Sequence, residues 1–155
     1  MNYELDQISE ELTEAISESF ENLFFADIEQ CVSVNEIETE EEALIVSVDT
    51  IAPFKGKVGL IIDKEMSEEI VMEMVGGDFD LIDKEMIADA LSEIGNTIVG
   101  RFLSKIVPED EEFSLGFPEC IKWNPNDYNY KSSENCKLFD LELEDKHVFC
   151  VLNKD

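Results

Sequence analysis

Basic side chains are scarce in this sequence. Its 155 residues include 11 Lys and Arg against 38 Asp and Glu, which gives a formal net charge of −27. The first 50 residues contain no Lys or Arg. Such a negative surface repels the phosphates of nucleic acids and of anionic lipids. We therefore expect no direct binding to nucleic acid or to membranes.

Side chains that bind transition metals or form disulfides are also few. There is one histidine, His147, and the four cysteines are widely spaced and form no C-x-x-C pair. This spacing is not that of a zinc site, so we predict no metal centre. We expect the cysteines to be reduced and mostly buried, since a free thiol behaves as a small apolar group.

Long apolar segments are missing as well. No stretch approaches the roughly 20 apolar residues that a membrane-spanning helix needs. The opening MNYELDQISEEL has neither the basic nor the apolar region of a secretory signal peptide. We expect a cytoplasmic protein with no insertion into membranes.

The sequence does have the apolar content of a globular protein, at 44%, with ten Phe. Its length is enough for one domain with a sizeable core and too short for two ordinary ones. We predict a single domain that spans residues 1–155.

Three segments have the three- to four-residue apolar spacing of amphipathic helices. The first covers residues 5–23. The second has Ser67 as a candidate N-cap and ends at the glycine pair 76–77, and the third runs from an Asp83 cap to about Val107.

Short runs rich in β-branched residues predict strands at 30–34, 43–49 and 55–63. Alternating residues at 136–153, interrupted by the turn EDK, predict a C-terminal hairpin. Helices grouped between hairpins favour an α+β fold, in which two long helices pack on a largely antiparallel sheet.

The segment DALSEIGNTIVG, residues 89–100, lies in the third helix but contains two glycines and an asparagine. On a helical wheel, Asp89, Glu93, Asn96 and Gly100 share one polar face that we expect to be exposed. Gly95 and Gly100 each cost up to about 1 kcal/mol relative to alanine inside a helix. This cost indicates that another surface approaches the helix backbone closely at these positions. The remaining apolar positions predict a buried stripe: Ile87, Leu91, Ile94, Ile98 and Phe102.

This segment resembles the signature helix of the CheC/CheX/FliY chemotaxis phosphatases, in which D/S-x-x-x-E-x-x-N is followed by Gly and later by Pro. Asp89, Glu93, Asn96, Gly100 and Pro118 occupy those places. The order of elements across residues 43–122 also matches the family.

The chain is most similar to CheX, because it has one copy of the signature. On the N-terminal helix, Ser19 stands where a second copy would need a Glu before Asn22.

The resemblance implies a phosphatase that hydrolyses the aspartyl phosphate of a CheY-like receiver domain. The receiver supplies the phosphorylated Asp, a magnesium ion and a lysine, so no cofactor of the chain's own is expected. By analogy with the family, Asn96 orients the attacking water, Glu93 pairs with the receiver lysine, and Asp89 and Gly100 belong to the partner-binding face. Positioning of this kind suits phosphoryl transfer, which needs little covalent assistance.

Two other functions stay open at this stage. One is a CheX-like module that binds a receiver or another signalling partner without hydrolysis. The other is an acidic inhibitor or immunity-type protein that blocks a basic partner. Gly95, beside the signature, also raises the question whether the helix is loosened next to Asn96.

A homodimer is expected on two grounds. The resemblance to CheX implies subunits that associate through their sheets, and the C-terminal hairpin has the character of edge strands.

Overall fold

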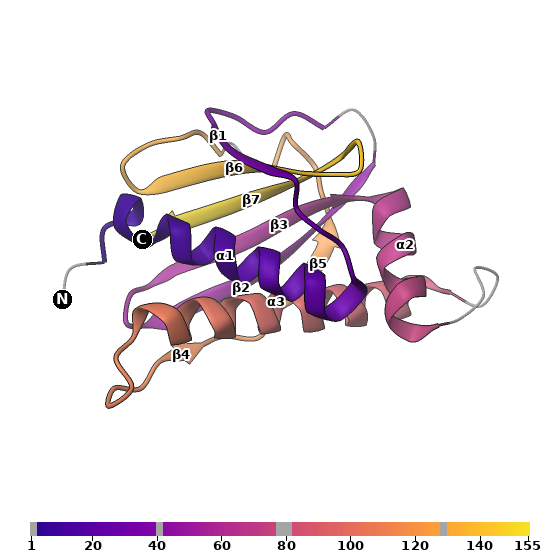
Figure 1. Ribbon diagram of the computed structural model, residues 1–155. Coiled ribbons are helices and arrows are strands. Elements are labelled where there is room, and N and C mark those ends of the chain that lie inside the picture. The colour runs from indigo at the N-terminus through magenta and orange to yellow at the C-terminus, as the bar shows by residue number, and fades with distance from the viewer. Residues whose placement is uncertain (1–2, 40–41, 77–81, 128–129) are drawn as a thin grey trace.

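The computed structural model describes residues 3–39, 42–76, 82–127 and 130–155. Within these ranges the chain forms three helices and seven strands (Figure 1). Their bounds in chain order are α1 Leu5–Phe24, β1 Gln30–Val34, β2 Ala43–Ala52, β3 Gly56–Asp63, α2 Lys64–Val75, α3 Lys84–Ile106, β4 Ser114–Leu115, β5 Glu119–Lys122, β6 Cys136–Leu143 and β7 Lys146–Lys154.

The strands form one sheet in the order β1-β6-β7-β3-β2-β4, and β5 also pairs with β2. Every strand pairing is antiparallel. The two long helices α1 and α3 lie side by side over the sheet, and the shorter α2 stands near one end of it (Figure 1). The predicted α+β fold is confirmed, with α2 as a third helix.

The main core lies between the two long helices and the sheet. Phe20 on α1 and Phe102 on α3 are fully buried there, together with side chains such as Val46 of β2 and Leu60 of β3. A smaller apolar cluster around Ile61 and Trp123 covers the opposite face of the sheet. Both faces of the central strands are therefore buried.

The start of α2 differs from the prediction. Asp63, the last residue of β3, is its N-cap, and its carboxylate accepts a hydrogen bond from the Met66 amide at 2.7 Å. Ser67 is fully buried and donates its hydroxyl to the Asp63 carbonyl at 2.9 Å. The prediction of Ser67 as the cap was wrong because the helix follows the strand without an intervening loop.

The other helix limits agree with the prediction. Gly76 ends α2 in the left-handed conformation, with a φ of 63°, whereas Gly77 lies outside the described residues. The Asp83 carboxylate caps α3 by accepting from the Met86 amide at 2.8 Å. This helix ends at Ile106, and Pro108 follows closely.

The C-terminal hairpin is not at an edge of the sheet. Strand β6 pairs with β1, and β7 pairs with β3, so both lie in the interior. The edge-strand argument for a homodimer was therefore wrong. The outer positions belong to β1 on one side and to β4 and β5 on the other.

A homodimer stays a prediction that rests on the resemblance alone, and a sheet-mediated contact would have to use one of these outer strands. Light scattering at micromolar protein should then give twice the chain mass. Because two strongly negative copies repel each other, the dimer should be strengthened by added salt. A monomer mass at both low and high ionic strength would contradict it.

Candidate functional site on helix α3

The surface of α3 carries the predicted polar row. Asp89, Glu93 and Asn96 are exposed, and Gly100 is half-buried. On the opposite face Ile94 and Ile98 are completely buried. The division into an exposed row and a buried stripe is thus confirmed except at Gly100, and Glu93 and Asn96 project from one helix face a single turn apart.

Gly95 faces the sheet and is buried. A Cβ atom placed on it would lie 3.1 Å from Cγ2 of Val46 and 3.4 Å from Cγ2 of Val48, both on β2. A Cβ atom here would force Val46 to move by a few tenths of an ångström, and a larger side chain would have to displace Val46 and Val48 further. The glycine lets the helix backbone approach β2 directly beneath the polar row, so its role is close packing beside Asn96.

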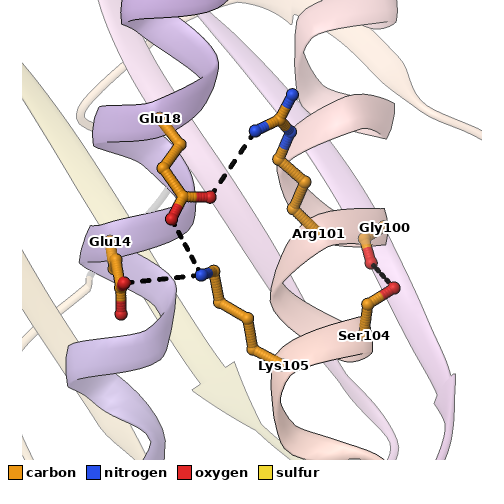
Figure 2. Close-up of polar contacts among 6 residues, drawn as sticks. All are labelled: Glu14, Glu18, Gly100, Arg101, Ser104 and Lys105. Atoms are coloured by element: carbon orange, nitrogen blue, oxygen red, sulfur yellow. Dashed lines mark hydrogen bonds and ion pairs between the residues drawn. The ribbon is translucent and has the colours of Figure 1, made fainter. Parts of the chain in front are cut away.

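Gly100 has a different environment. A Cβ atom on it would meet nothing within 4 Å. Its carbonyl accepts a hydrogen bond from the Ser104 hydroxyl at 2.9 Å, as Figure 2 shows. The fold therefore does not require a glycine at this place. The effect of Gly100 is that no side chain covers the helix surface beside the row.

Ion pairs join α3 to α1 next to the row (Figure 2). Glu18 accepts from Lys105 at 2.9 Å and lies 3.5 Å from Arg101, and Glu14 lies 3.5 Å from Lys105. The hydrogen bond from Lys105 lowers the pKa of Glu18, and the same bond raises the pKa of Lys105. These two α3 cations are thus engaged by α1.

Sequence reasoning missed this network. The partners come from a helix far away in the chain, so no local pattern indicates them. The pairs also fix the direction of α1, which runs antiparallel to α3, since Glu14 and Glu18 meet Lys105 and Arg101 in reverse order.

A second signature on α1 is excluded by packing. Ser19 is fully buried on the inner side of α1. A Glu at this position would place a carboxylate in the core, at a high desolvation cost. The single signature on α3 is therefore consistent with the way α1 packs.

Pro118 lies between β4 and β5, on the outer edge of β2. It is half-buried, and it flanks the strand on which Gly95 packs. The fold thus brings Pro118 to the edge of the sheet that lies next to α3, although it is far from the row in sequence.

Metal-binding clusters of three or more His, Cys, Asp or Glu are absent from the part of the chain that the structure describes. His147 is paired with Asp140, at 2.8 Å between Nδ1 and Oδ1. Cys136 and Cys150 are buried, Cys120 is half-buried and Cys31 is exposed. Burial raises the pKa of Cys120 to about 11, so this thiol is not a reactive thiolate at neutral pH.

None of the helices in the described ranges combines the length and apolar character needed to cross a bilayer.

Several solved structures of chemotaxis proteins have the same architecture. CheX from Borrelia burgdorferi, in a structure described as a CheX-CheY-BeF3-Mg+2 complex, superimposes with a TM-score of 0.73 at 18% identity and covers 94% of this chain and 96% of its own. CheX from Desulfovibrio desulfuricans gives 0.72 at 12% identity, covering 96% and 99%. FliY from Thermotoga maritima gives 0.63 at 17% identity, covering 96% and 87%. These likenesses define the CheC/CheX/FliY fold.

Within that class the chain belongs to the CheX family, because the family model described as "Chemotaxis phosphatase CheX" matches residues 44–142. The match contains the whole of α3 and its polar row. No curated protein matches the chain.

Proposed function

We propose that this protein is a phosphatase that hydrolyses the aspartyl phosphate of a CheY-like receiver domain. The observation that carries the proposal is the exposed pair Glu93 and Asn96 on a helix packed tightly against the sheet. The family description and the solved complex of a distant CheX with CheY support the choice of partner.

Asn96 is assigned to the attacking water. Its carboxamide has both a donor and an acceptor, so it can hold a water molecule in one orientation. In-line phosphoryl transfer depends mainly on such positioning and does not require a general base from this chain. Because Asn96 is exposed on a convex helix, it can enter a concave receiver site that already holds the phosphoryl group and its magnesium ion.

Glu93 is assigned to the receiver lysine. It lies one turn before Asn96 on the same exposed face, so both side chains can reach one partner site together. Within the described residues Glu93 forms no ion pair, whereas Arg101 and Lys105 are engaged by Glu18. Its carboxylate is therefore available to a partner cation. Asp89 and Gly100 extend the same docking face at either end of the row.

The proposal is tested by incubating the wild-type protein with a panel of phosphorylated receivers and following phosphate release with time. Acceleration for at least one receiver is the expected result. Measurable docking without acceleration would favour a binding module, and the absence of both with every receiver would contradict the proposal.

Glu93→Ala is expected to raise the KM for the phosphorylated receiver about tenfold or more, because a charge pair across the interface is lost. The defect should be partly overcome at high receiver concentration. It should also shrink at high ionic strength, which screens the lost attraction. Steady-state rates over a range of receiver and salt concentrations measure both effects.

Glu85→Ala is the matched control, since it removes one exposed carboxylate from the first turn of the same helix. Equal KM values for the Glu93 and Glu85 variants would show that only overall charge matters and would contradict the assigned role of Glu93.

A further inference from the structure

Phe117 is the most exposed of the large apolar side chains in the described ranges, with 97% of its surface accessible. Single exposed apolar residues are common on protein surfaces and need no explanation by themselves. Phe117 is informative because of how its backbone is held and because of what lies beside it.

The backbone around Phe117 forms a β-bulge on the outer edge of β2. The flanking pairs are Thr50 with Leu115 and Ser47 with Glu119. Between these pairs β2 has two residues, whereas the opposing chain has three, Gly116–Pro118. The opposing chain therefore has one residue more than β2 at this place, as in a β-bulge, and such an irregularity redirects side chains at sheet edges.

This bulge is fixed on both sides of Phe117. The Gly116 amide donates to the Asp49 carbonyl at 2.8 Å. On the other side, the ring of Pro118 fixes the φ of Pro118 and restricts the backbone of Phe117 to extended conformations. The fold thus presents an unburied aromatic ring on a constrained backbone, so little conformational entropy is lost when a partner covers it.

The bulge lies at the level of Asn96 along α3. Gly116–Pro118 lie opposite Val48 and Asp49 of β2, and Val48 is one of the two side chains nearest to the Gly95 position. Gly95 immediately precedes Asn96. Phe117 therefore lies at the edge of β2, the strand against which α3 packs at Gly95.

Asn96 is the member of the polar row that points farthest from α1. Arg101 points to α1, where it meets Glu18. Asn96 is about 140° away from Arg101 around the helix axis, at 100° per residue. Helix α1 packs against β6 and β7, whereas α3 packs against β2 and also contacts β5 at the outer edge of β2, so β5 lies on the flank of α3 away from α1. Asn96 thus lies on the side of α3 where the bulge is found.

We propose that Phe117 is a docking residue for the receiver, which packs an apolar patch beside its phosphorylation site against this ring. The proposal rests on the phosphatase function proposed above and extends the docking face from α3 to the edge of the sheet. Phe117 acts on affinity and on the choice of receiver, and it takes no part in the chemical step.

A second copy of the chain is the competing occupant, and the structure disfavours it. Addition of a strand needs a continuous edge, whereas this edge has a two-residue β4, a bulge and a proline without an amide hydrogen. A second copy would also bring the same charge of −27 to the contact.

Phe117→Ala tests the proposal in the full chain. We expect the KM and the Kd for the receiver to rise about tenfold, as for an aromatic residue that a partner packs against, with kcat at saturating receiver unchanged. Phe117→Leu should keep most of the affinity. Because the ring is exposed, the thermal unfolding of both variants should match that of the wild type.

Ile51→Ala is the matched control. Ile51 is an apolar residue at the same end of β2 and is half exposed, but it alternates with Thr50 and so points to the sheet face away from the helices. Its removal should leave receiver affinity unchanged.

Unchanged affinity in Phe117→Ala would overturn the proposal even if the wild type is an active phosphatase. A change in molar mass without a change in receiver affinity would overturn it in favour of a second copy. If the wild type docks on receivers without hydrolysis and Phe117→Ala weakens docking, the proposal for Phe117 stands and only the catalytic function fails. No docking by the wild type would overturn both.

Discussion

Asn96→Ala is expected to slow the loss of phosphate from the cognate receiver about 100-fold or more, because releasing a positioned reactant typically costs that much. Docking should be nearly unchanged, since the side chain acts on the water and Glu93 still engages the partner. The measurement is kcat at saturating receiver, together with the Kd for the same receiver.

The structure makes this variant easy to interpret. Asn96 is exposed, so its truncation leaves no cavity and should not change the thermal unfolding of the protein. Ser92→Ala, a half-buried neighbour on the same helix, is the control and should have a mild effect on kcat. Equal kcat values for Asn96→Ala and the wild type would rule out the assigned mechanism.

The helices were predictable because their signals are local. Apolar spacing located α1 and α3, and Asp83 was recognised as a cap from its place before the helix. Ser67 and Asp63 show the limit of such reasoning. Both are good capping residues, and only the direct passage from β3 into α2 decides between them.

The order of the strands could not be predicted from alternation. A period of two shows which side chains share a face, but it does not show which strand lies next to which. Strand β1 pairs with β6, which is far along the chain, and this pairing moves the C-terminal hairpin into the interior of the sheet. The apparent edge strands are therefore central ones.

The site was predicted in part. The helical wheel and the family resemblance placed Glu93 and Asn96 on one exposed face, and the structure agrees on their exposure. The partners of Arg101, the strand beneath Gly95 and the bulge at Phe117 depend on contacts between distant segments. A single sequence has no local signal for such contacts.

Gly95→Leu is expected to destabilise the protein, because the new side chain must enter the space occupied by Val46 and Val48. Overpacking of this kind costs about 1–3 kcal/mol. The displaced helix should also carry Asn96 out of position, so kcat should fall together with stability. Chemical denaturation and phosphate-release assays measure the two effects.

Gly100→Leu is the control for this variant because it makes the same chemical change five residues further along α3, where a Cβ atom meets nothing. Both variants gain the same helix propensity, about 0.5–1 kcal/mol over glycine, so the difference between their unfolding free energies isolates the packing of Gly95. We expect Gly100→Leu to be at least as stable as the wild type and to raise the KM for the receiver, because its bulk stands on the docking face. If the two variants were equally stable, α3 would not be in close contact with β2, and the rigid support proposed for Asn96 would be wrong.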